Sequence, residues 1–176
     1  MKYVALLRGI NVGGKNKVDM KQLVAALIEV GLEGVSYYLN TGNIFFASDA
    51  SQQELTTTIH DVIEREFGLD IKVLLRDETS IQKVTAEIPS DWQNTPEIKC
   101  NVMFLWEKYD TPDVLEQLKI RPEIDEVFYE SGAVVWRTKQ SDFNRSGMSK
   151  LVGSDIYKHM TIRNVNTFRK IAEKTK

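Results

Sequence analysis

Short apolar runs alternate with longer amphipathic segments over the first 76 residues of the chain. Apolar side chains recur at helical spacing over 20–28 and again over 51–67, so these segments are predicted to be helices. Ser51 and Glu54 have the spacing of a capping box, and Gly68 is a typical helix end. Four shorter runs have the length and composition of strands, at 3–7, 35–39, 44–47 and 71–75.

This order of elements predicts a ferredoxin-like βαββαβ unit. In that topology the first two strands run parallel, and the third lies antiparallel between them. We expect a four-stranded antiparallel sheet with both helices on one face. The loop after the first strand and the turn at 40–43 should then open at the same end of the sheet.

The second half repeats part of this order after a polar loop at 89–96, which is the expected boundary. A connecting helix is predicted over 77–88. The remaining elements are a strand at 98–106, a helix from Thr111, hairpin strands at 127–129 and 133–137, a helix within 141–160, and a final helix capped by Thr161. We therefore expect an α+β protein. Its ferredoxin-like unit covers 1–90, and a second, incomplete βαββα unit with a basic C-terminal helical segment covers 97–176.

Composition and charge limit the cellular compartment and the kinds of binding partner to expect. Cys100 is the single cysteine, so no internal disulfide can form, and a reducing cytoplasm is expected. No apolar run is long enough for a membrane span. The net charge is −2, yet residues 137–176 carry +7 and the rest of the chain −9. This asymmetry favours an anionic partner or homo-oligomer formation, although two solvated faces of opposite sign would also produce it.

The first loop is the main candidate binding site. It is rich in glycine and basic residues, follows a buried strand and leads into a helix N-terminus. This arrangement binds anions, because backbone N–H groups and the helix dipole point at the loop. The candidate ligand-binding residues at this end are Arg8, Asn11, Gly13, Gly14, Lys15, Lys17, Asn40 and Asn43.

The same loop comes close to the motif G-x-x-x-x-G-K-[ST] of nucleoside triphosphatases, from Gly9 to Lys15. Asn16 replaces the hydroxyl residue that would hold Mg²⁺. Those enzymes also need a parallel sheet, whereas this sequence turns back in a hairpin. A nucleoside triphosphatase is therefore disfavoured.

A second polar cluster lies near the C-terminus, where Arg163, Asn164 and Asn166 are expected in the first turn of the final helix. An arginine there opposes the helix dipole, which points to an anionic ligand or to an acidic partner within the protein. The sequence leaves open whether this cluster and the first loop form one site.

Catalytic chemistry is weakly represented. Cys100 falls in a predicted strand, and His60 and His159 fall in predicted helices, where packing or surface roles are the simpler interpretation. No cysteine and histidine spacing suits a metal. We assign no catalytic residue, metal or cofactor.

Three stretches resemble a known family. They are Leu-Leu-Arg-Gly-Ile-Asn-Val-Gly-Gly-Lys at 6–15, Asn-Thr-Gly-Asn at 40–43 and Thr-Ile-Arg-Asn-Val-Asn-Thr at 161–167. Together they are similar to the bacterial family catalogued as domain of unknown function 1697. The resemblance implies a soluble α+β protein of ferredoxin-like character with no assigned activity. Thr41 and Val165 stand where members often carry Ser and Trp.

Three functions remain open at this point. The preferred hypothesis is a binding module for an anionic, phosphate- or carboxylate-bearing ligand at the first loop, either a small molecule or a nucleic acid backbone. The second is a small enzyme acting on such a metabolite, with Lys15 or Arg8 as the electrostatic group. The third is a protein-interaction or homo-oligomeric module.

Overall fold

The computed structural model describes residues 1–176, which form two compact units. The first unit contains Met1–Thr79 together with Glu173–Lys176, and the second contains Ser80–Ala172. None of the helices combines the length and the apolar character that crossing a membrane requires. The division into a ferredoxin-like domain at 1–90 and a second domain at 97–176 stays a prediction.

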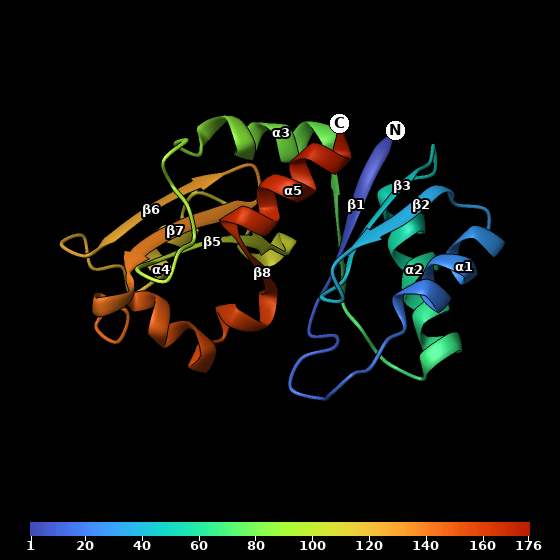
Figure 1. The fold of residues 1–176 in the computed structure, drawn as a ribbon, viewed down its shortest axis with the longest axis horizontal. Helices are drawn as coiled ribbons and strands as arrows, with labels where there is room; N and C mark the ends of the chain where they lie inside the picture. The colour runs from blue at the N-terminus through green and yellow to red at the C-terminus, as the bar shows by residue number, and fades with distance from the viewer. The chain divides into compact units, whose positions relative to one another are not determined.

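The first unit is a ferredoxin-like sheet with two helices on one face (Figure 1). Its sheet has the order β2-β3-β1-β4, with every neighbouring pair antiparallel. The predicted topology of this unit is therefore confirmed, since β3 lies between the parallel strands β1 and β2. The elements are β1 (Lys2–Leu7), α1 (Met20–Glu29), β2 (Glu33–Tyr38), β3 (Asn43–Ala47), α2 (Gln52–Phe67) and β4 (Val73–Asp77).

Alternation along the strands and capping at the helix ends explain why these elements form. Tyr3, Ala5 and Leu7 share one face of β1 and pack in the same core as the apolar stripes of both helices. The predicted capping box is present, because the Ser51 side chain accepts from the backbone N–H of Glu54 and the Glu54 carboxylate accepts from that of Ser51. These local devices fix where α2 begins.

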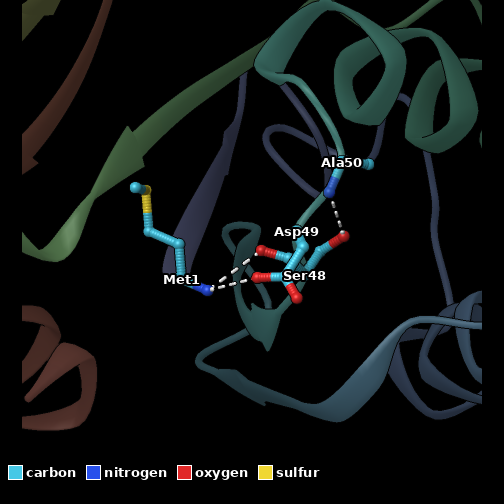
Figure 2. Close-up of polar contacts among 4 residues, drawn as sticks. All are labelled: Met1, Ser48, Asp49 and Ala50. Atoms are coloured by element: carbon cyan, nitrogen blue, oxygen red, sulfur yellow. Dashed lines mark hydrogen bonds and ion pairs between the residues drawn. The ribbon is translucent and has the colours of Figure 1, made fainter.

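The start of β1 is tied to the segment between β3 and α2 (Figure 2). The Met1 nitrogen donates to the Ser48 carbonyl at 3.0 Å and to the Asp49 carboxylate at 3.3 Å. The Ala50 N–H donates to the Ser48 hydroxyl at 3.2 Å, which closes a tight turn before α2. These contacts continue the pairing of β1 with β3 by one residue beyond the strand, to Met1.

The second unit has the same strand order as the first, β6-β7-β5-β8, and is again antiparallel throughout. One face of this sheet carries α5, where Phe104 and Phe168 rings lie 5.8 Å apart. The other face packs against α4 and three short 3-10 helices. The elements are α3 (Glu78–Glu87), β5 (Ile98–Leu105), η1 (Glu107–Tyr109), α4 (Val114–Gln117), β6 (Asp125–Glu130), β7 (Ala133–Lys139), η2 (Gln140–Asp142), η3 (Gly147–Gly153), η4 (Ile156–His159), β8 (Met160–Asn164) and α5 (Val165–Thr175).

The α+β class is confirmed, but the expectation that the second unit lacks its fourth strand is wrong. Residues 160–164 form β8, which pairs with β5. Met160 and Ile162 face the core shared with the 3-10 helices, whereas Thr161 and Arg163 alternate onto the opposite face. Because three of the five side chains are polar, the segment does not look like an apolar run.

The final helix consequently starts three residues later than predicted. Thr161 lies within the strand, and the Asn164 side chain accepts from the Thr167 N–H at 2.9 Å as the helix cap. The helix expected within 141–160 is also absent as an α-helix, and this stretch forms 3-10 turns. Gly147, Gly153 and several serines disfavour a continuous α-helix there.

A buried carboxylate holds this 3-10 segment against the sheet. Asp125 accepts from the Ser146 hydroxyl at 2.5 Å, from the Arg121 N–H at 2.9 Å and from the Gly147 N–H at 3.2 Å. Burial raises the pKa of Asp125, but the Ser146 hydroxyl, the backbone donors and the nearby Trp136 indole outweigh it and leave the pKa below its usual value. The Trp136 indole itself makes no regular hydrogen bond.

Candidate functional site

The first loop has a left-handed backbone at five positions. Gly9, Gly13 and Gly14 have positive φ, and so do Asn11 at 53° and Asn16 at 48°. Asparagine tolerates this region better than most residues with a Cβ. The N–H of residue 15 donates to the carbonyl of residue 12 at 3.1 Å, which makes Gly13 and Gly14 the tip of a tight turn.

Asn11 ties this loop to two neighbouring segments. Its side-chain oxygen accepts from the Val18 N–H at 2.8 Å, and its side-chain NH₂ group donates to the Val18 backbone carbonyl at 3.0 Å. The same amide donates to the Asn40 carbonyl at 2.7 Å. The loop and the β2–β3 turn therefore lie together, at the end of the sheet where the topology predicts them.

The β2–β3 turn itself is tightly packed. Asn43 is fully buried and its amide donates to the Tyr38 carbonyl at 2.7 Å. Gly42 has a φ of +87°, and a Cβ added there would lie 2.6 Å from the Leu7 Cβ. In this turn Asn40 is exposed and Asn43 is part of the packing, so the two asparagines predicted together occupy different environments.

A cleft of about 830 Å³ opens beside the loop within the first unit. Four of the predicted residues line it, whereas Arg8, Gly13, Lys15 and Asn43 do not. Lys17 is exposed and forms no ion pair in the protein. The lining residues are Asn11, Gly14, Lys17, Val18, Asp19, Met20, Lys21, Gln22, Tyr37, Asn40 and Phe67.

The N-terminus of α1 offers fewer free backbone donors to an anion than the sequence predicts. The Asp19 carboxylate accepts from the N–H groups of Lys21 and Gln22 at 2.9 and 3.0 Å, so these donors are already used. The carboxylate also places a negative charge in the wall of the cleft. Attraction of an anion to this cleft must therefore come from the ammonium groups of Lys17 and Lys21.

Seven lining residues are not among the predicted ligand-binding residues: Val18, Asp19, Met20, Lys21, Gln22, Tyr37 and Phe67. Lys21 carried a usable signal, because a basic residue in the first turn of a helix opposes the dipole. Tyr37 lies within a predicted strand, close to the end of the sheet that carries the first loop and the β2–β3 turn. Only the strand register, in which Tyr37 pairs with Ile44, decides which face its ring occupies.

The predicted C-terminal cluster lies in the second unit, and its side chains are engaged there. Arg163 is buried on β8, where Nη1 donates to the Thr161 hydroxyl and to the Ile162 carbonyl, both at 2.9 Å. Burial lowers the Arg163 pKa to about 10. Asn166 accepts from the Asn94 N–H at 3.1 Å and donates to its carbonyl at 2.8 Å. A ligand-binding role for Arg163, Asn164 and Asn166 stays a prediction.

Several other basic side chains of 137–176 also have partners within the second unit. Arg137 pairs with Glu126 at 2.7 Å, and Arg145 pairs with Asp142. Arg169 donates to the carbonyls of Trp92 and Pro89 at 2.6 and 3.0 Å. The positive charge of this segment is thus partly neutralised locally.

Two titratable groups bear on catalysis. Burial raises the pKa of the Cys100 thiol to about 11, so this cysteine is protonated at neutral pH and is a poor nucleophile. His60, Asp61 and Glu64 bring donor atoms within 4.8 Å of one another, which makes them the nearest approach to a metal site. Both His60 ring nitrogens already contact carboxylates, at 3.3 Å from Asp61 and 2.9 Å from Asp70.

We expect His60 to titrate above its ordinary pKa of 6.5, because the hydrogen bonds to Asp70 and then Asp61 stabilise the imidazolium. Its contribution to stability is then complete below the unfolded pKa and fades as the pH rises through the folded pKa. An NMR titration of the imidazole protons measures this directly. Asp70→Asn should lower the His60 pKa more than Asp61→Asn, and equal effects would contradict the shorter contact with Asp70.

Two four-stranded sheets of ferredoxin-like order, with a cleft beside a basic loop in the first, define a two-unit α+β protein. A family model described as "Protein of unknown function (DUF1697)" matches residues 1–136, so the chain belongs to this family. The chain is also similar to a solved structure described as the conserved bacterial protein SP0830 from Streptococcus pneumoniae. The identity is 29%, the TM-score is 0.85, and the match covers 99% of this chain and 98% of that one. A comparison with curated proteins gives no match.

Proposed function

We propose that the cleft of the first unit binds a small anionic ligand bearing a phosphate or carboxylate group. The observation that carries this proposal is the pair of exposed lysines, Lys17 and Lys21, in the wall of an 830 Å³ cleft. Neither ammonium has an anionic partner in the protein. A volume of this size is ordinary for a small-molecule site, which falls at about 300–1,000 Å³.

The rest of the lining suits a ligand with a polar end. Gly14 adds a backbone position without a side chain at the cleft wall, and Asn40 adds an exposed amide. Asn11 holds these parts in place through its three hydrogen bonds. The backbone of the cleft wall is therefore held in place before binding, which reduces the entropy lost on binding.

The first test is a thermal-shift screen of phosphate- and carboxylate-bearing metabolites, with affinities then measured by calorimetry. A ligand present at 100 times its Kd should stabilise the protein by about 2.7 kcal/mol. If no compound of either class binds the wild-type protein, the proposal is wrong.

Lys17→Ala combined with Lys21→Ala should weaken the binding of a ligand found in this way by about tenfold, since an exposed ion pair contributes up to about 1 kcal/mol. The melting temperature should change little, because both side chains are exposed. Lys83→Ala is the matched control, as Lys83 is an exposed lysine of the second unit. An equal loss of affinity in Lys83→Ala would indicate a general charge effect instead of a site.

Asp19→Ser provides a test of opposite sign. Serine can still cap α1, while the negative charge in the cleft wall is removed. Affinity for the anion should then rise by about threefold, by the Coulomb energy of a partly solvated pair. Unchanged affinity would place the anion elsewhere.

A further inference from the structure

Aromatic side chains form a second part of the same cleft. Tyr37 and Phe67 both line it, and both are half-buried and packed against the core of the first unit. The rings are thus held by packing while part of each remains open to the cleft. This is the arrangement in which a side chain can offer a face or an edge to a planar ligand.

Unused hydrogen-bonding groups lie beside these rings. The Tyr37 phenol makes no hydrogen bond in the protein, although the side chain is half-buried. Asn40 contributes its backbone carbonyl to Asn11, but its side-chain amide has no partner. A phenol and an amide can each donate and accept, which suits the edge of a heterocycle that carries both kinds of group.

Lys17 and Lys21 complete the lining with positive charge. We infer that the ligand of this cleft joins a planar heterocycle to a phosphate group, as a nucleoside monophosphate does, with the ring against Tyr37 and the phosphate at the lysines. This inference rests on the proposed function, because it identifies the class of anion that the cleft takes. A single nucleotide fits better than a strand, since both aromatic side chains line one cleft and do not form an extended stacking surface.

Three compounds separate the parts of this inference. Adenosine 5′-monophosphate contains both the ring and the phosphate, ribose 5-phosphate lacks the ring, and adenosine lacks the phosphate. Calorimetry with the full chain should show adenosine 5′-monophosphate binding about tenfold more tightly than ribose 5-phosphate, because base stacking on an aromatic side chain contributes a factor of about this size. It should also bind about tenfold more tightly than adenosine, which has no phosphate for the two lysines to pair with.

Variants then assign each part to its residues. Tyr37→Leu keeps an apolar side chain against the core but removes the ring. It should therefore weaken the binding of adenosine 5′-monophosphate by about tenfold and leave the affinity for ribose 5-phosphate unchanged. Lys17→Ala combined with Lys21→Ala should weaken the binding of adenosine 5′-monophosphate and of ribose 5-phosphate, and should leave the affinity for adenosine unchanged. Tyr37→Phe isolates the phenol, and circular dichroism checks that each variant is folded.

The outcomes distinguish this inference from the proposed function. Equal affinity for ribose 5-phosphate and adenosine 5′-monophosphate would overturn the ring subsite and leave anion binding in place. The inference also fails if adenosine 5′-monophosphate does not bind while another phosphate or carboxylate from the screen does. Loss of ribose 5-phosphate binding in a folded Tyr37→Leu protein would show that Tyr37 shapes the whole cleft instead of contacting a ring.

Discussion

Replacing Gly147 with alanine should lower the free energy of unfolding of the second unit by about 3 kcal/mol, at the upper end of the usual cost of overpacking. A Cβ at this position would lie 1.9 Å from the Lys119 carbonyl oxygen and 2.5 Å from its carbon. These are backbone atoms, so no side-chain rotation relieves the clash. The same Cβ would also lie 3.1 Å from an atom of the Trp136 ring, which is a tight contact.

Gly153→Ala is the matched control for this prediction. Gly153 ends the same 3-10 helix, and a Cβ there meets no atom within 4 Å. Its stability should change by no more than about 0.5 kcal/mol. Urea unfolding followed by tryptophan fluorescence is the measurement, because Trp92, Trp106 and Trp136 all belong to the second unit. Similar losses in both variants would show that the close approach at Gly147 does not exist in solution.

The first unit could be predicted because its local signals agree with its long-range pairing. Three of the four strands are mainly apolar runs, both helices have caps, and the Asn40–Asn43 turn joins strands that are neighbours in the sheet. The order β2-β3-β1-β4 then follows from the few ways in which these elements can pack. Local and global preferences point to one structure, which is the condition for reading a fold from sequence.

The second unit was only partly predictable because its last strand depends on a distant partner. Thr161 has the composition of a helix cap, and locally nothing distinguishes it from Asn164, which performs that role. Pairing with β5 places Thr161 and Arg163 on one face and extends the strand through both. Long-range pairing thus overrides a local capping preference.

The candidate site was predictable in position but not in composition. The topology placed the first loop beside the β2–β3 turn, and the contact between Asn11 and Asn40 follows from it. Which side chains face the cleft depends on strand register and on the ends of two helices. This is why Tyr37 and Phe67 were missed, and why Asn43, which looked available for a ligand, is buried in the turn.

Asp125→Ala should destabilise the second unit by about 4 kcal/mol, because three donors lose their acceptor and each buried unsatisfied group costs about 1–3 kcal/mol. The donors are the Ser146 hydroxyl and the N–H groups of Arg121 and Gly147. Since the folded pKa of Asp125 is lowered, this stabilisation is present above the unfolded pKa and is lost as the pH falls through the folded one. The wild type should therefore lose stability in acid more steeply than Asp125→Ala does.

Ser146→Ala separates the buried hydrogen bond from the loss of the carboxylate itself. It removes the hydroxyl that donates to Asp125 at 2.5 Å and accepts from the Met148 N–H at 3.0 Å, and it should cost about 2 kcal/mol, chiefly the contribution of a hydrogen bond to a charged group. The double variant should lose less free energy of unfolding than the sum of the losses in the two single variants, because both single changes break the same bond. Urea unfolding monitored by tryptophan fluorescence gives all four free energies. Strictly additive losses would mean that Asp125 and Ser146 act independently, and that the carboxylate holds the 3-10 segment through its backbone donors alone.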